Sequence, residues 1–160
     1  LNYGNDLVGW RSQEVDLEDC YSPRRNKDRC DVEVNLSDYD LQEIKYWFNL
    51  TDLTNAYDDS RPRAIEVDVS PPRIDYFNYT RAGRSTYMNI NITEENFDKI
   101  LYIDYADKRP KWRTLCSRLR NKACEKRKLF REGERNISIN VLDEALNSAM
   151  IENIIFEVDY

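Results

Sequence analysis

Residues 87–93 read Tyr-Met-Asn-Ile-Asn-Ile-Thr, and this stretch decides the fold class. Apolar side chains occupy every second position, which is the period of a β-strand with one buried face and one polar face. The segment before it ends in Arg81-Ala-Gly-Arg84, where Gly83 can adopt the positive φ of a hairpin turn. The sequence therefore predicts an antiparallel hairpin over 74–93.

The same alternation recurs along most of the chain after residue 30. Each further stretch places Val, Ile, Leu or aromatic residues two positions apart, with polar residues between them. Residues 1–29 lack this pattern, and we expect irregular structure there. Many short strands with one polar face are typical of two antiparallel sheets packed face to face. The further predicted strands are 32–36, 44–50, 65–69, 101–105, 137–141 and 154–158.

Two segments show apolar residues at helical spacing instead. In 111–131, Trp112, Leu115 and Leu119 fall near one face of a helix. In 142–150, Leu and Ala residues show a similar pattern over about two turns. The sequence therefore predicts an all-β or β-rich fold, an antiparallel β-sandwich with one or two short helices.

Ser70-Pro71-Pro72 is the strongest break in the chain, because consecutive prolines cannot lie in a central strand. We expect a single β-rich extracellular domain over 1–160. The alternative is an N-terminal module over 1–69 and a sandwich module over 70–160. Residues 70–160 have the usual size of an immunoglobulin-like or fibronectin type III-like sandwich. This comparison concerns size alone, because the Cys…Trp…Cys spacing of antibody domains is absent.

Histidine is absent from the chain. Its absence excludes Ser-His and Cys-His nucleophile pairs and removes the commonest zinc ligand. The sequence also contains no phosphate-binding glycine loop, nucleophile elbow or HExxH motif. We therefore expect a protein that is not an enzyme and that uses no cofactor and no metal site.

Five N-x-[ST] sequons indicate N-glycosylation and hence an extracellular location. The composition predicts only about one or two such tripeptides by chance, so five is an excess. Three of the asparagines stand between apolar residues of predicted strands, which directs them to the solvent-facing side. The predicted glycosylation sites are Asn35, Asn49, Asn78, Asn91 and Asn136.

The four cysteines are even in number and form no CxxC motif, which favours disulfides in an oxidising compartment. Three pairings are possible, and we favour Cys20–Cys30 and Cys116–Cys124 because each closes a short loop. The second pair carries a condition. A continuous helix would separate Cys116 and Cys124 by about 12 Å. A disulfide needs less than about 7 Å, so either the helix breaks or these cysteines pair elsewhere.

The charge distribution is uneven. Residues 111–135 contain ten Lys or Arg and three Glu, whereas the whole chain has a net charge of −6. We predict an anionic partner, such as a sulfated glycan, at Lys126, Arg127, Lys128 and Arg131. The alternative is a solvated face that balances acidic neighbours. We expect no nucleic-acid partner, because the chain is acidic overall.

Trp47 stands out of phase with Ile44, Tyr46 and Phe48, so it should lie on the opposite face of its strand. There it would be an exposed protein-binding anchor or cover for a second layer.

No stretch is apolar enough to span a membrane. We therefore expect a secreted protein, or the extracellular face of a membrane protein. Its function would be recognition of another extracellular protein, as a receptor or adhesion ectodomain or as a secreted ligand. The alternative is a secreted decoy whose acidic surface captures a basic cytokine or chemokine.

Overall fold

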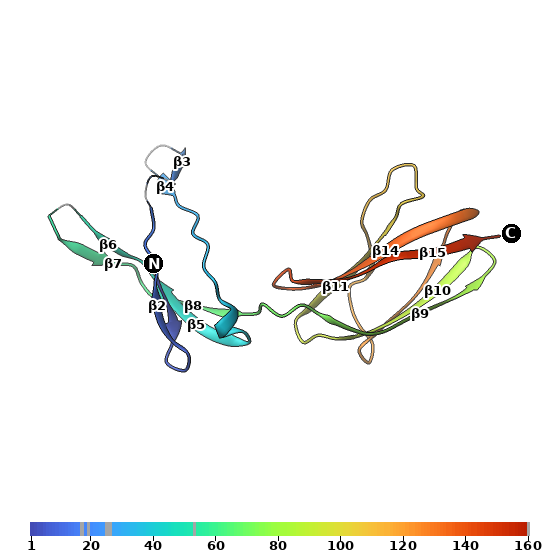
Figure 1. Cartoon of the computed structure of the whole chain (residues 1–160), viewed down its shortest axis with the longest axis horizontal. Coiled ribbons are helices and arrows are strands. Elements are labelled where there is room, and N and C mark those ends of the chain that lie inside the picture. Colours follow the sequence, from blue (N-terminus) through green and yellow to red (C-terminus); the bar gives the residue numbers. More distant parts are fainter. Residues whose placement is uncertain (17, 19, 25–26, 53, 160) are drawn as a thin grey trace. The chain divides into compact units, whose positions relative to one another are not determined.

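The computed structural model describes residues 1–16, 18, 20–24, 27–52 and 54–159. This part of the chain forms fifteen strands and one 3-10 helix, which confirms the predicted β-rich fold (Figure 1). The chain divides into two compact units, unit 1 (Leu1–Val69) and unit 2 (Ser70–Tyr160), so the division falls at the Ser-Pro-Pro stretch. A single domain over 1–160, with the two modules as the alternative, stays a prediction.

Unit 2 is a sandwich of two antiparallel sheets, and Figure 1 shows β9 and β10 in one layer and β11, β14 and β15 in the other. The three-stranded sheet has the order β13-β10-β9, and the four-stranded sheet has the order β12-β11-β14-β15. The strands are β9 (Arg73–Ala82), β10 (Ser85–Thr93), β11 (Phe97–Asp104), β12 (Arg113–Cys116), β13 (Ala123–Leu129), β14 (Gly133–Asp143) and β15 (Ser148–Val158).

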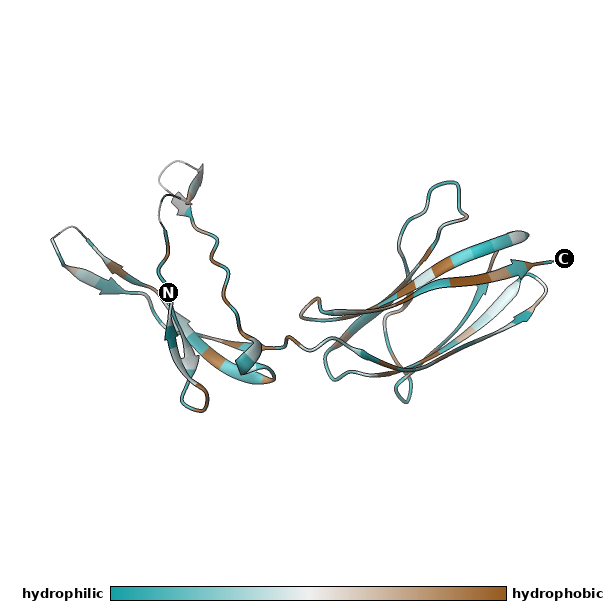
Figure 2. Cartoon of the chain, viewed as in Figure 1, coloured by the Kyte–Doolittle hydropathy of each residue, from teal (hydrophilic) through white to brown (hydrophobic). Residues whose placement is uncertain are grey.

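The predicted alternation places the core of unit 2 between these sheets. Met88, Ile90 and Ile92 of β10 are buried, and the residues between them face outward. On the other sheet, Ile137 and Ile139 of β14 are fully buried in the same cluster. Figure 2 shows hydrophobic and hydrophilic residues in turn along β14. The hairpin turn between β9 and β10 contains Gly83 at a φ of +54°, as its position in the sequence predicts.

The predicted helix over 111–131 is wrong. β12 pairs with β11, whereas β13 pairs with β10, so the two halves of this segment belong to different sheets. The turn 117–122 between them is sharp, with positive φ at Asn121 and Lys122. The Cα atoms of Cys116 and Cys124 lie 6.1 Å apart and a disulfide joins them. The disulfide therefore forms and the continuous helix does not, which is one of the two outcomes that the spacing of Cys116 and Cys124 allows.

The predicted helix over 142–150 is also wrong, because this segment is the hairpin that connects β14 to β15. The carboxylate of Asp143 accepts hydrogen bonds from the backbone N–H of Asn147 at 2.7 Å and from its side-chain amide at 2.9 Å. Leu146 in the turn has a φ of +72°. An aspartate that bonds the backbone four residues ahead stabilises a turn in place of a helix.

Unit 1 contains a four-stranded antiparallel sheet of order β2-β1-β5-β8 and two small hairpins. Strands therefore occur within residues 1–29, where we expected irregular structure. The predicted strand over 32–36 is absent, although its apolar and polar residues alternate in burial as predicted. The elements are β1 (Asn2–Asn5), β2 (Gly9–Ser12), β3 (Tyr21–Arg24), β4 (Lys27–Arg29), η1 (Ser37–Tyr39), β5 (Gln42–Trp47), β6 (Asn49–Thr51), β7 (Tyr57–Asp59) and β8 (Arg63–Val67).

The core of unit 1 is small and covers one face of this sheet. Its buried apolar residues are Tyr3, Tyr39, Ile44 and Val67, with Val34 and Leu36 among the residues packed against them. The 3-10 helix η1 positions Tyr39, whose hydroxyl donates a hydrogen bond to the carbonyl oxygen of Gly9 at 3.0 Å. The opposite face of the sheet carries the side chains that alternate with these along each strand, among them Trp10 of β2 and Trp47 of β5.

Candidate binding surfaces

Trp47 lies on the face of the unit 1 sheet that points away from the core, as its position out of phase with Ile44 predicts. The ring of Trp10, from β2, lies on the same face, and the two ring centroids are 5.3 Å apart in an edge-on arrangement. Trp10 remains 47% exposed. The sheet therefore carries a pair of tryptophans on its open face.

The backbone around Gly4 explains how Trp10 reaches this position. Gly4 of β1 stands directly opposite Trp10 in the ladder and has a φ of +141°. A Cβ at this position would collide with the carbonyl oxygen of Gly9 and would lie 2.9 Å from the Cα of Trp10. The indole N–H of Trp10 donates a hydrogen bond to a carboxylate oxygen of Asp6 at 3.0 Å, which fixes the ring from the other side.

The hairpin between β1 and β2 adds two exposed apolar side chains close to Trp10 in the sequence. The side-chain oxygen of Asn5 accepts hydrogen bonds from the backbone N–H groups of Leu7 at 3.1 Å and of Val8 at 2.8 Å. This arrangement stabilises a tight turn. It leaves Leu7 82% exposed at the tip. We define the aromatic surface as Trp10, Trp47 and this hairpin tip, Leu7 and Val8.

The four basic residues predicted to bind an anion lie in different surroundings. Alternation along β13 puts Arg127 on the opposite side from Lys126 and Lys128. Arg127 donates a hydrogen bond to the hydroxyl of Ser85 at 2.9 Å, whereas the ammonium of Lys128 lies 5.0 Å from the ring centre of Tyr102. These residues therefore do not present one continuous surface.

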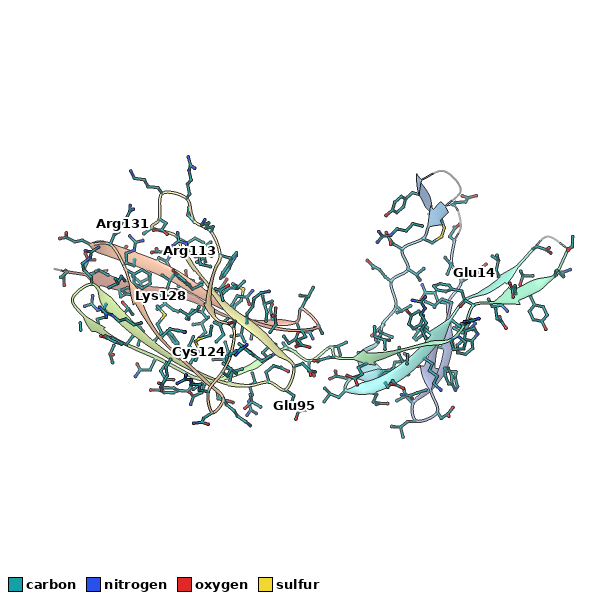
Figure 3. The ribbon with its side chains drawn as sticks, turned by 180° about the vertical axis from the view of Figure 1, so that it is seen from behind. Glu14, Glu95, Arg113, Cys124, Lys128 and Arg131 are labelled. Atoms are coloured by element: carbon teal, nitrogen blue, oxygen red, sulfur yellow. A yellow bond between two sulfur atoms is a disulfide. The ribbon has the colours of Figure 1, made fainter. Side chains whose placement is uncertain are left out.

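Arg131 instead belongs to a cleft of about 580 Å³ in unit 2, which we call the basic cleft. The cleft lies between the loop 105–112 and residues 129–135, with Tyr102, Leu129 and Phe130 as its less polar lining. Figure 3 shows Arg113, Lys128 and Arg131 on the side of unit 2 from which this loop projects. Its basic residues are Lys108, Arg109, Lys111, Arg113, Arg131 and Arg135.

Two carboxylates organise two of these guanidinium groups. Arg135, which is buried, donates hydrogen bonds to Asp104 and a further one to Asp107 at 3.1 Å. Arg113 donates to the other oxygen of Asp107 at 2.6 Å. Burial alone would raise the pKa of Asp107, but the hydrogen bond and charge of Arg113 and the charge of Arg135 outweigh burial and lower that pKa.

The sequence did not single out the loop residues of this cleft. The basic stretch 111–135 begins after Lys108 and Arg109, so these two residues lie outside it. Their signal was present in Asp107-Lys-Arg-Pro-Lys111, a short basic run after a predicted strand. Strand β11 pairs with β12 on one side and with β14 on the other, and this brings the loop 105–112 close to residues 131–135. Neither of these strand pairings was predicted from the sequence.

The sequon asparagines differ in exposure. Asn35, Asn49 and Asn78 are exposed, whereas Asn91 and Asn136 are half-buried. The side-chain oxygen of Asn35 accepts hydrogen bonds from the backbone N–H and the hydroxyl of Ser37, at 3.0 Å and 2.7 Å. Its amide nitrogen, the atom that carries a glycan, is thus left for solvent. Asn78 and Asn91 lie diagonally across β9 and β10 on the outer face of the three-stranded sheet.

The structure contains two disulfides, Cys20–Cys30 and Cys116–Cys124, which are the pairings that we favoured. Disulfides are typical of proteins in oxidising compartments. Among the described residues, no helix combines the length and apolarity that crossing a membrane needs. No protein-family model matches the chain, and no curated protein sequence matches it either.

Proposed function

We propose that this chain is an extracellular, N-glycosylated module that recognises another protein and does not act by catalysis. It would serve as a receptor or adhesion ectodomain or as a secreted ligand. The observation that carries the proposal is the Trp10–Trp47 pair on the open face of the unit 1 sheet.

Tryptophan is enriched among the residues that dominate protein interfaces, because it buries a large rigid surface at low entropic cost. Trp10 is fixed by its contact with Trp47 and by its hydrogen bond to Asp6, so the ring is held in place before a partner arrives. Preorganised side chains lose less freedom on binding. The aromatic surface therefore has the properties of an interface anchor.

The positions of the sequons support the same assignment. None of the five lies in β2 or β5, the strands that carry the two tryptophans, and Asn49 follows Trp47 by two residues, at the start of β6. Asn78 and Asn91 share the outer face of the three-stranded sheet in unit 2, where two glycans would exclude a protein partner. Glycans at Asn78 and Asn91 would therefore cover the three-stranded sheet of unit 2, so we assign the protein interface to unit 1.

The extracellular part of the proposal is tested on protein purified from a secreting eukaryotic host. Treatment with an N-glycosidase should lower its mass, and peptide mapping should locate glycans at Asn35, Asn49 and Asn78. Native protein should contain no titratable thiol. An unchanged mass together with four free thiols would contradict the extracellular assignment.

The binding part is tested with the secreted chain as a probe on an array of extracellular proteins and ectodomains. The double variant Trp10→Ala/Trp47→Ala should lose a bound partner that the native chain retains. Trp112→Ala, which removes the third tryptophan of the chain in unit 2, is the matched control and should keep that partner. Binding that survives the double variant, or an array without any partner, would overturn the aromatic surface as the interface.

A second candidate, a decoy for a basic cytokine or chemokine, is favoured by the charge of unit 1. Residues 1–69 contain 8 Lys or Arg and 16 Asp or Glu, a net charge of −8, whereas residues 70–160 carry 16 and 14, a net charge of +2. Glu43 and Glu66 are cross-strand partners on the same face as Trp47, and both are exposed. Like charges directly opposite each other destabilise a sheet, and a cationic partner would relieve the repulsion.

The decoy candidate predicts salt-sensitive association with basic chemokines, because complementary charge accelerates encounter. Surface plasmon resonance against a panel of basic chemokines, with acidic cytokines as controls, measures this directly. Equal binding to both groups, or to neither, would remove the decoy function and leave the general binding module.

A further inference from the structure

The loop 105–112 and residues 129–135 enclose more positive charge than the basic cleft neutralises. Of its six basic residues, Arg113 and Arg135 are paired with Asp104 and Asp107. Lys108, Arg109, Lys111 and Arg131 have no ion-pair partner among the described residues, and all four are exposed. The cleft therefore has a net charge of +4 from its lining residues.

The paired residues give the cleft a rigid floor. Arg135 is held by Asp104, and Arg113 is held by Asp107, so neither guanidinium needs to be ordered by a ligand. Tyr102 and Phe130 are buried beside them, with their ring centroids 6.3 Å apart. Lys128 lies over Tyr102 at the margin and adds a further cation. The cleft therefore has two fixed guanidinium groups at its floor and four exposed lysine and arginine side chains at its rim, which can adapt to a ligand.

We propose that the basic cleft binds sulfo groups of a sulfated polysaccharide. A sulfo group keeps its negative charge at every physiological pH, and its oxygens accept hydrogen bonds from guanidinium and ammonium groups. Individual exposed ion pairs are weak and screened by salt, so the ligand must present several anionic groups at once. A sulfated polysaccharide does so along its length, and its sugar rings offer C–H surfaces to the exposed side chain of Leu129.

The choice of this polyanion rests on the proposed extracellular location, where sulfated polysaccharides are abundant, but not on the aromatic surface. The cleft also differs from the set predicted from the sequence. It retains Arg131 and adds the loop residues Lys108, Arg109 and Lys111, whereas Arg127 lies on another face. The basic residues around the turn 117–122 line a separate depression.

The test measures binding of the full chain to a heparin oligosaccharide by titration calorimetry and by elution from immobilised heparin. The cleft variant is Lys108→Ala/Arg109→Ala/Lys111→Ala. The matched control is Arg118→Ala/Arg120→Ala/Lys122→Ala, which removes the same charge from exposed positions of another turn in unit 2. Because all six side chains are exposed, both variants should retain the native melting temperature.

We expect the cleft variant to bind heparin roughly tenfold more weakly at physiological salt, since several modest ion pairs are lost together. It should also show a shallower dependence of affinity on salt, whereas the control should bind like the native chain. An equal loss in both variants would mean that heparin responds to net charge alone. No loss in the cleft variant would place the ligand elsewhere. Either outcome overturns the proposal.

Three further probes distinguish the ligand classes. N- and O-desulfated heparin tests the sulfo groups, poly-L-glutamate represents an acidic protein, and phosphatidylserine vesicles represent an anionic membrane. Sulfated heparin should bind more tightly than all three, and equal binding to any one of them overturns the assignment to sulfated polysaccharide. Trp10→Ala/Trp47→Ala should bind heparin normally, so a failure of this proposal and a failure of the protein interface are separately visible.

Discussion

Arg135 of β14 is paired with Asp104 of the neighbouring strand β11, and their side chains are only 6% and 2% exposed. Removing two charges from water is costly, and the ion pair compensates for this only when both partners are present and hydrogen-bonded. Here the carboxylate accepts from two nitrogens of the guanidinium. This pair thus fixes the floor of the basic cleft and makes unit 2 sensitive to the loss of either partner.

We predict that Asp104→Asn lowers the free energy of unfolding by about 3–5 kcal/mol, because it leaves a buried guanidinium without its main counter-charge. Asp98→Asn provides the control on the same strand. Asp98 pairs with Lys99 at 2.8 Å, but both side chains are more than a third exposed, so its loss should cost less than about 1 kcal/mol. Urea unfolding of the two variants measures the difference. Similar losses of unfolding free energy in Asp104→Asn and Asp98→Asn would show that the buried ion pair matters no more to stability than the exposed one.

Asp107 should make the stability of unit 2 depend on pH. Its folded-state pKa is lowered, so its contribution is fully present above the unfolded pKa of about 4 and is lost as pH falls through the lower folded value. Asp107→Asn should therefore cost about 2 kcal/mol at pH 7, the range for hydrogen bonds to charged groups. The gap between native chain and variant should narrow at strongly acidic pH, where the native carboxyl is also neutral. A gap that is constant with pH in urea unfolding would contradict this role.

Local alternation was sufficient to predict the strands that pack the core of unit 2. The hairpin 74–93 and the strands around 137–141 and 154–158 occur as β9, β10, β14 and β15. Alternation determines which face of a strand is buried, and this depends only on neighbours in sequence. The wrong helix over 111–131 arose where longer-range contacts prevail, since a disulfide and two separate sheet partners determine its path. The wrong helix over 142–150 instead gives way to a local turn, in which Asp143 accepts hydrogen bonds from Asn147.

The candidate surfaces show the same limit. Trp47 could be assigned to the open face because its neighbours in sequence are out of phase with it. Its contact with Trp10 could not be predicted, because β1 lies between the strands of the two tryptophans and must pair with β5. These two strands are about forty residues apart, and the local sequence pattern does not show which residues pair. The basic cleft likewise joins segments whose proximity is set by the order of strands in the four-stranded sheet.

The two disulfides should contribute differently. Each closes a loop of similar length, so each should stabilise its unit by about 2–3 kcal/mol through the unfolded state. Cys116–Cys124 is also buried in the core and joins β12 of one sheet to β13 of the other. Cys116→Ala/Cys124→Ala should therefore destabilise the chain more than Cys20→Ser/Cys30→Ser, whose Cys30 is exposed. Equal changes in the midpoint of thermal unfolding would contradict a core role for Cys116–Cys124.

Glu43 and Glu66 offer a test that separates stability from binding. The two carboxylates are cross-strand partners, and their side chains have no hydrogen-bond or ion-pair partner among the described residues. Glu43→Gln/Glu66→Gln removes the repulsion and should raise the free energy of unfolding by about 0.3 kcal/mol at low salt, with a smaller gain at high salt.

A basic protein that docks on the aromatic surface should respond in the opposite direction. The same double variant should slow its association several-fold at low salt and leave its dissociation nearly unchanged, because exposed charges at the rim act mainly on encounter. Asp58→Ala/Asp59→Ala, which removes the same charge from the β6–β7 hairpin without creating a glycosylation sequon, is the control for net charge. A variant that gains stability and also keeps its association rate would show that the two glutamates do not face the partner. An equal slowing in both variants would assign the effect to the charge of unit 1 as a whole.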